Sequence, residues 1–463
     1  MIRAKFFART ALGLVVALGV AAGTAAPALA KDKPAAQQKA PDLKPSKTYI
    51  PAYLAAKNAL DAAVKRPEVI AAKAKLTAAQ TAYENATGKK AKADAMAQMD
   101  AATAELAGLL TAEKGLVEAA IAASTIPDDK HLSGSLLLNL GNLGFNKEAQ
   151  RRGIQMQLES GKLAAADVPK YNAIVGRLSM DLKDYPAART ALQTALDAGY
   201  TADDVAVTLA DAYIKDGQQA AGLKVLEDAT TKAGAAAPAD WMRYGASVAY
   251  KAKLPNEASW FSNALVASYP TTENWSLALA VVRDMRGYAG QDQIDLLRLM
   301  ERTKSFLEER DYVDYIQAAD PRRLPGEALK VVNLGLAAGK LNPADQFVSD
   351  AKAQASGRIA ADKASLPGLE KDARAAGSTA ATAQAAGDAF LSYDDAAKAE
   401  AMFALALTKP GVDVSRVNLR LGITQADQGK WAEAQASFAK VTDARAPIAQ
   451  LWSAYAQGKA AGK

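Results

Sequence analysis

The stretch DYPAARTALQTAL, residues 184–196, decides the fold class of this chain. Its apolar and small residues recur every three or four positions, so they share one face of a helix. They are Tyr185, Ala188, Leu192 and Ala195. Because two of the four are alanines, a second helix can approach this face closely. The stretch therefore predicts one helix of a tightly packed pair, and its recurrence would establish the fold.

The same pattern recurs along the chain with a period of about 35 residues. The residues that take the place of Ala188 in other units follow at steps of one or two periods. They are Ala149, Gly222, Ala258, Ala328, Ala399 and Ala434. The double steps leave room for weaker units near Gln293 and Ala364, giving about nine units in residues 131–445. A fixed period of this length predicts an all-α stack of helical pairs.

Each clear unit has the same internal order. A first helix carries an apolar and a small residue side by side: Val175-Gly176, Leu209-Ala210, Ala386-Gly387 and Leu421-Gly422. After a turn, a second helix carries a small residue and a large apolar residue four positions later: Ala188/Leu192, Gly222/Leu226, Ala399/Phe403 and Ala434/Phe438. Small residues let the two helices touch, and large residues fill the space against the next unit.

This pattern resembles the tetratricopeptide repeat (TPR), whose motif runs W-x2-L-G-x2-Y, then A-x3-F, then P. The matching residues are Leu209-Ala210 with Tyr213, Leu421-Gly422, Gly387 with Phe390, Ala399/Phe403, Ala434/Phe438 and Tyr269-Pro270. The tryptophan of the motif is mostly missing, and most units lack the proline. The resemblance covers roughly 300 residues and is weak at 271–310 and 340–380, which we expect to be ordinary helical pairs.

The resemblance implies an α-α superhelix, a TPR-like solenoid, whose first helices line a concave groove. It also implies that the protein binds another protein or a peptide and is not itself a catalyst. Polar side chains one or more turns beyond the helix-packing residues are the candidates for lining this groove. They are Arg177, Asp181, Asp211, Lys215, Tyr250, Lys251 and Arg286.

The first 30 residues have the layout of a secretory signal peptide. A basic start is followed by a 12-residue apolar run, 11–22, and by an A-x-A cleavage site that ends at Ala30. Because the run is too short to span a bilayer comfortably, we expect cleavage after Ala30 rather than an uncleaved anchor. The sequence thus predicts a periplasmic protein, with secretion as the alternative and no stable membrane insertion after cleavage. Without cysteine, such a protein has neither disulfides nor a lipoprotein anchor.

Three further segments flank the repeats. Residues 31–47 are rich in lysine and proline, which predicts a disordered tether. Residues 48–125 are rich in alanine and lysine with helical spacing, and they predict a helical hairpin that breaks at 85–90 and is kinked or interrupted at Pro67. Residues 446–463 predict a C-terminal capping helix and tail.

The sequence offers little for catalysis or for nucleic acid. His131 is the only histidine and cysteine is absent, so no Ser-His-Asp triad, Cys-His pair or multi-histidine metal site can be built. We expect His131 to cap a helix or lie on the surface, and Asp128 and Asp129 to occupy a helix N-terminus. No phosphate-binding glycine loop occurs, so no cofactor and no metal is expected. Without the signal peptide the net charge falls from +6 to +3, and the basic residues are interleaved with acidic ones, which argues against nucleic acid.

The signal-peptide pattern and the resemblance together favour an exported, non-enzymatic TPR scaffold that binds a protein or peptide partner. The resemblance also implies a role in envelope assembly or polysaccharide export, because similar repeat proteins support these processes. One alternative is a cell-wall enzyme of the superhelical lytic transglycosylase type, but the repeats leave no span for a separate catalytic domain. The other alternative is a self-assembling structural array of helices. The oligomeric state and the identity of the partner stay open.

Overall fold

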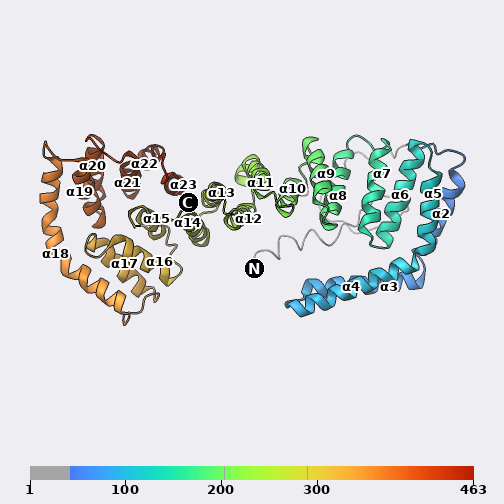
Figure 1. Cartoon of the computed structure of the whole chain (residues 1–463), viewed down its shortest axis with the longest axis horizontal. Helices are drawn as coiled ribbons and strands as arrows, with labels where there is room; N and C mark the ends of the chain where they lie inside the picture. The colour runs from blue at the N-terminus through green and yellow to red at the C-terminus, as the bar shows by residue number, and fades with distance from the viewer. Residues whose placement is uncertain (1–41, 203, 289, 463) are drawn as a thin grey trace. The chain divides into compact units, whose positions relative to one another are not determined.

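The computed structural model describes residues 42–462 except 203 and 289, and in this part of the chain every regular element is a helix (Figure 1). The chain divides into two compact units, Met1–Gln218 and Gln219–Lys463, and each has its own packing. The predicted signal peptide and residues 31–41 of the predicted tether lie outside the described residues. Among the residues that the structure describes, no helix is both long and apolar enough to cross a membrane. The architecture is an all-α, TPR-like array of helical hairpins.

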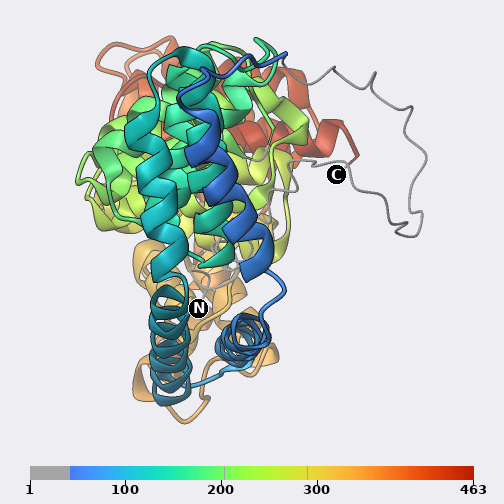
Figure 2. The same ribbon diagram turned by 90° about the vertical axis from the view of Figure 1, so that its right-hand side faces the viewer.

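The first unit begins with a hairpin whose two arms are each divided into two helices. The first arm consists of α2 (Ile50–Ala63) and α3 (Pro67–Asn85), and the second of α4 (Lys89–Leu109) and α5 (Thr111–Ala123). Pro67 is the first residue of α3, where a missing backbone N–H leaves no hydrogen bond unmade. Helix α2 packs along α5, and α3 packs along α4 (Figure 2).

The helical repeats of the first unit follow this hairpin. They are α6 (Pro127–Leu143) with α7 (Lys147–Glu159), α8 (Val168–Asp181) with α9 (Tyr185–Asp197), and α10 (Val205–Lys215). A methyl group added at Gly176 would lie 2.4 Å from the side chain of Leu192, so the small residue of one helix receives the large residue of the other. The structure therefore confirms the packing that the opening stretch predicts.

The α6–α7 contact is closer still, because glycine lies on both helices. A Cβ atom at Gly153 would lie 2.6 Å from the backbone nitrogen of Leu138 and 2.7 Å from the carbonyl oxygen of Gly134. These two helices therefore touch backbone to backbone, which side chains larger than hydrogen would prevent.

Ion pairs join each hairpin of the first unit to the next. In α7, Lys147 Nζ lies 2.6 Å from Asp181 at the end of α8, and Arg151 Nη1 lies 2.7 Å from Asp184, which begins the following turn into α9. Arg152 pairs in the other direction, 2.9 Å from Glu118 in α5. These pairs run along the stack and fix the register of successive hairpins.

Two expectations for the first unit are wrong. The end of the predicted tether is ordered, because the Ser46 N–H and hydroxyl both donate to the Asp129 carboxylate at 2.8 Å. The composition of residues 31–47 does not indicate that the Asp129 carboxylate, more than 80 residues further along the chain, accepts these bonds. His131 is neither a cap nor a surface residue, since it is only 6% exposed and its Nδ1 lies 3.3 Å from Ser160 Oγ. Helix α6 packs against α2, α5 and α7, so little of its circumference is left for solvent.

The second unit contains the remaining helices. They are α11 (Gln219–Ala233), the short 3-10 helix η1 (Gly234–Ala236), α12 (Ala239–Lys251), α13 (Pro255–Ser268), α14 (Thr272–Arg286), α15 (Gly290–Arg302), α16 (Glu309–Ala319), α17 (Pro325–Ala337), α18 (Gln346–Arg374), α19 (Ala380–Ser392), α20 (Ala396–Leu407), α21 (Val414–Asp427), α22 (Trp431–Phe438) and α23 (Ala446–Ala460). Here phenylalanine takes the place of Leu192. A Cβ at Gly422 would lie 2.4 Å from Phe438, and one at Gly387 would lie 2.7 Å from Phe403.

The two weak regions of the repeat differ from each other. Residues 271–310 contain a helical pair, α14 and α15, as expected. Residues 340–380 do not contain such a pair, because α18 runs unbroken for 29 residues and continues through Pro367. The prediction of a helical pair near Ala364 is therefore wrong. The fully buried residues of α18 are Val348, Ala351, Ala355 and Ala373. Between them, Leu366 and Leu369 are half-buried and pack against the core of the unit.

The second unit closes on itself through its last helix. Helix α23 packs against α21 and α22, its neighbours in the sequence, and also against α13, α14 and α15 (Figure 1). The indole N–H of Trp452 donates to the carbonyl oxygen of Asp295 at 2.8 Å, and the hydroxyl of Tyr288 donates to that of Ala444 at 2.6 Å. The predicted capping helix therefore also completes a core that includes residues of α13–α23.

A buried cluster of charges lies where the second unit closes. Arg298 Nε lies 2.7 Å from Glu327, and Arg298 Nη1 lies 2.8 Å from Asp295. Asp295 also receives a bond of 3.3 Å from Arg420 on α21, and Arg420 is 2.7 Å from Asp388 on α19. All five side chains are buried, so each charge depends on its partners.

This cluster predicts that the second unit loses stability in acid. Burial alone would raise the pKa of Glu327, but the ion pair with Arg298 and the hydrogen bonds from Arg298 and Tyr315 lower it to about 2 from the usual 4.5. Because the folded pKa is the lower one, the stabilisation is complete above pH 4.5 and is lost as the pH falls from there toward 2. Urea unfolding at a series of pH values should show this loss, and Glu327→Gln should make it shallower. Equal slopes for the two proteins would contradict the prediction.

Candidate functional site

The predicted groove residues of the first unit are largely engaged with the protein itself. Asp181 pairs with Lys147, as described above. Asp211 is only 2% exposed, and Lys215 Nζ lies 2.6 Å from its carboxylate, so the structure brings these two together as an ion pair. Arg177 is half-buried on α8. Their role in binding stays a prediction.

The predicted residues of the second unit fall into two kinds. Tyr250 is 43% exposed and Lys251, the last residue of α12, is exposed beside it in the sequence. Arg286 instead fastens α14 to the start of α13, because its Nη2 donates to Asn256 Oδ1 at 2.9 Å and to the Pro255 carbonyl oxygen at 3.1 Å. The structure thus leaves Tyr250 and Lys251 available to a partner and gives Arg286 a structural role.

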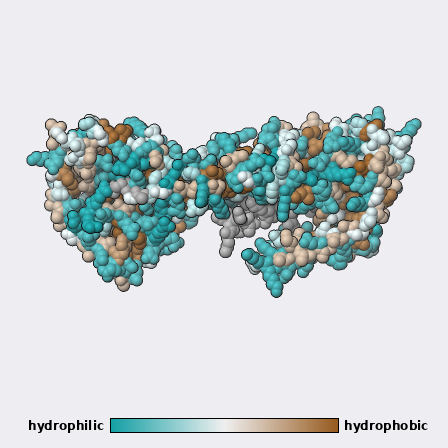
Figure 3. All heavy atoms as spheres, viewed as in Figure 1, coloured by the Kyte–Doolittle hydropathy of each residue, from teal (hydrophilic) through white to brown (hydrophobic). Residues whose placement is uncertain are grey.

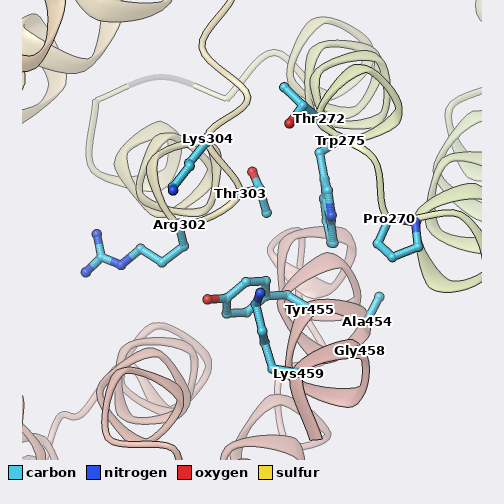
Figure 4. A pocket seen from close by; sticks show the side chains of 10 residues that line it. All are labelled: Pro270, Thr272, Trp275, Arg302, Thr303, Lys304, Ala454, Tyr455, Gly458 and Lys459. Atoms are coloured by element: carbon cyan, nitrogen blue, oxygen red, sulfur yellow. The ribbon is translucent and has the colours of Figure 1, made fainter. Parts of the chain in front are cut away.

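A pocket that the sequence did not reveal lies between α14, α15 and α23 (Figure 4). We call it the α23 pocket. Its volume is about 250 Å³, and its lining residues are Pro270, Thr272, Trp275, Arg302, Thr303, Lys304, Ala454, Tyr455, Gly458 and Lys459. Thr272 comes from the first turn of α14, Arg302 from the last turn of α15, and Lys459 from the last turn of α23. The return of α23 to the middle of the unit is what assembles these residues.

The α23 pocket is positively charged, and its three cations differ in how their charge is balanced. Arg302 lies 2.8 Å from Asp427 and also pairs with Glu301. Burial opposes the charge of Arg302, but these two carboxylates raise its pKa above the ordinary value. Lys304 and Lys459, in contrast, have no carboxylate within 4 Å in the described part of the chain. The pocket therefore carries unbalanced positive charge from these two lysines.

An aromatic wall forms the other side of the α23 pocket. The rings of Trp275 and Tyr455 meet edge to face with their centroids 6.4 Å apart, and Trp275 is 4% exposed. Burial raises the pKa of Tyr455, and the nearby charge of Asp427 adds to the effect, so its phenol stays neutral and can donate a hydrogen bond at neutral pH. Lys459 Nζ lies 5.7 Å from the centre of the Tyr455 ring.

This arrangement suits the noncovalent binding of an anion. The lining contains two unbalanced lysines, two threonines and two aromatic rings, but no carboxylate or histidine that could exchange a proton with a ligand. Nor does the described part of the chain group three or more histidine or acidic side chains where a metal ion could sit. Recognition by charge is the chemistry that these residues offer.

Sequence reasoning missed this pocket because its residues lie far apart in the chain. Thr272 and Lys459 belong to helices separated by most of the second unit, and nothing in the repeat indicates that α23 returns to α14. The one indication of this closure in the sequence is the distribution of tryptophan. Three of the five tryptophans of an aromatic-poor chain, Trp275, Trp431 and Trp452, gather around Tyr455.

Comparison with known proteins gives only distant likenesses. No protein-family model matches the chain, and no curated protein matches it in sequence. Among solved structures, one of Naa15/Naa10 bound to HypK-THB is similar at 13% identity and a TM-score of 0.33, covering 88% of this chain and 73% of that chain. A human IFIT1 dimer with PPP-AAAA is similar at 16% identity and a TM-score of 0.20, covering 86% of this chain and 95% of that chain. Similarities of this size carry no argument about what the present chain binds.

Proposed function

We propose that this protein is an exported, non-enzymatic scaffold of TPR-like repeats that binds a protein or peptide partner. The observation that carries the proposal is the exposed pair Tyr250 and Lys251 at the end of α12, held on a stack of closely packed hairpins. Stacked hairpins form extended, rigid surfaces on which a partner can bind without ordering the protein first.

The chemistry of this pair suits a protein partner. Tyrosine is enriched in protein interfaces because it buries a large ring and keeps a hydroxyl for hydrogen bonding. On the face of the molecule seen in Figure 3, hydrophobic residues lie scattered among hydrophilic ones. Recognition of a partner would then depend on single aromatic anchors such as Tyr250, with polar contacts around them.

The place of action in the proposal is the cell envelope, most simply the periplasm. Its support is the signal-peptide pattern of residues 1–30. A scaffold at that location would serve envelope assembly or polysaccharide export. Cell fractionation and N-terminal sequencing test this part: a mature protein that begins at Lys31 in the periplasmic fraction supports it, and an uncleaved cytoplasmic protein contradicts it.

A photo-cross-linking amino acid placed at Tyr250 tests partner binding in cells. The expected result is one discrete adduct with a single envelope protein, identified by mass spectrometry. The matched control places the same amino acid at Leu334, which is exposed to a similar extent (41%) on α17. A discrete adduct at residue 250 but not at 334 supports the proposal. No adduct at residue 250, or the same adducts at both positions, would overturn it.

A further inference from the structure

We propose that the α23 pocket binds a phosphoryl group carried on a small organic molecule. This site is independent of the partner surface at Tyr250 and Lys251. The first argument for it is the charge of the pocket. Lys304 and Lys459 supply two positive charges without a carboxylate partner among the described residues, while the charge of Arg302 is already balanced. A phosphoryl group carries a charge of about −1.5 to −2 at neutral pH, which matches the two lysines.

Helix capping does not account for these lysines. Basic residues near a helix C-terminus can bond the last carbonyl groups. At the end of α15, however, the carbonyls of Leu299 and Glu301 already accept bonds from the backbone N–H groups of Thr303 and Lys304 at 3.0 Å. At the end of α23, the carbonyl of Gln457 accepts a bond from the Ala461 N–H at 3.0 Å. Neither ammonium group has a hydrogen-bond acceptor in the described part of the chain, and that of Lys459 lies over the Tyr455 ring.

The donors of the pocket favour a phosphoryl group over a carboxylate, which carries only a single negative charge. Lys304 follows α15, Lys459 lies on α23, and Thr272 lies on α14, so the three donors enter from three separate elements. The Thr272 hydroxyl has no hydrogen-bond acceptor in the described part of the chain. A phosphoryl group presents three terminal oxygens, so it can accept hydrogen bonds from donors on different elements.

Size and the aromatic wall define the rest of the ligand. A volume of about 250 Å³ is below the 300–1,000 Å³ typical of drug-sized ligands, so the phosphoryl group leaves room for only a few carbon atoms. The half-buried ring of Tyr455 offers an apolar surface to that organic part, and the buried ring of Trp275 packs against it. The ligand class is thus a small phosphate ester, either free or at the head of a lipid.

Calorimetric titration of the full chain with glycerol 3-phosphate tests the site, with acetate as the carboxylate control. We expect saturable binding of glycerol 3-phosphate, weaker binding of inorganic phosphate and none of acetate. Lys304→Gln and Lys459→Gln should each weaken binding about tenfold, and Thr272→Val should weaken it less, because charge-assisted bonds are the stronger ones. Lys440→Gln, which removes an exposed lysine elsewhere in the same unit, should leave it unchanged.

The possible outcomes are distinct. Absence of saturable binding, equal weakening by Lys440→Gln, or equal binding of acetate would overturn the proposal. Vesicles of phosphatidic acid, whose headgroup is a phosphate monoester, separate the two sources of the group when they are compared with phosphatidylcholine vesicles. Co-sedimentation that depends on Lys304 and Lys459 assigns a lipid headgroup, and titration by free glycerol 3-phosphate without co-sedimentation assigns a soluble ester. Because the Tyr250 cross-link does not involve this pocket, failure here leaves the proposed partner binding untouched, and the reverse holds as well.

Discussion

Arg298→Met should lower the free energy of unfolding of the second unit by about 3–5 kcal/mol, the usual cost of removing one member of a buried ion pair. Arg298 is 1% exposed and binds both Glu327 and Asp295. Methionine fills a similar space but cannot donate, so both carboxylates would remain buried without this partner. Urea unfolding followed by circular dichroism measures the change.

The matched control is Arg374→Met, the same substitution at an exposed pair. Arg374 lies 2.9 Å from Glu370 one helical turn earlier, and both side chains are solvent-accessible. Such pairs contribute little because water already solvates both charges. We expect no measurable change for this variant. Similar effects of the two substitutions would show that the buried cluster does not stabilise the unit.

Gly153→Ala should lower the free energy of unfolding of the first unit by about 1–3 kcal/mol, the usual cost of overpacking. The added methyl group would lie 2.6 Å from the backbone nitrogen of Leu138 and 2.7 Å from the carbonyl oxygen of Gly134. Backbone atoms within a helix cannot rotate away as a side chain can, so α6 and α7 would have to separate. Thermal unfolding of the full chain should show a lower transition temperature.

The same substitution at Gly115 should act in the opposite direction. Gly115 lies inside α5, it is exposed, and nothing lies within 4 Å of a Cβ built there. Alanine should therefore raise the free energy of unfolding by about 0.5–1 kcal/mol, because glycine weakens the interior of a helix. If Gly153→Ala were also neutral or stabilising, the backbone contact between α6 and α7 would not exist in solution.

The helical repeat could be predicted from the sequence because its determinants are local. The pairs Gly176/Leu192 and Gly422/Phe438 each lie within one hairpin, so their spacing is visible in any window of about 35 residues. The same reasoning failed at α18, where one helix continues through Pro367 and Gly368 although these residue types usually interrupt a helix. A period alone does not distinguish one long helix from a hairpin.

The closure of the second unit could not be predicted, because its determinants are distant in the sequence. Asp295 meets Arg420, 125 residues away, and its carbonyl oxygen meets Trp452, 157 residues away. No periodicity links such residues. The α23 pocket depends on this closure, so the repeat pattern indicates binding residues on the first helices and gives no sign of Thr272, Lys304 and Lys459.

The position of α23 also determines when the second unit can complete its fold during synthesis. In the first unit, neighbouring hairpins contact one another, and each can pack as soon as it has left the ribosome. The second unit cannot complete its core so early, because α13, α14 and α15 keep an uncovered apolar face until Trp452 and its helix have been made. For the time needed to translate the intervening residues, this nascent surface is open to aggregation and to chaperones, and that interval is set by the distance from α15 to α23 along the messenger.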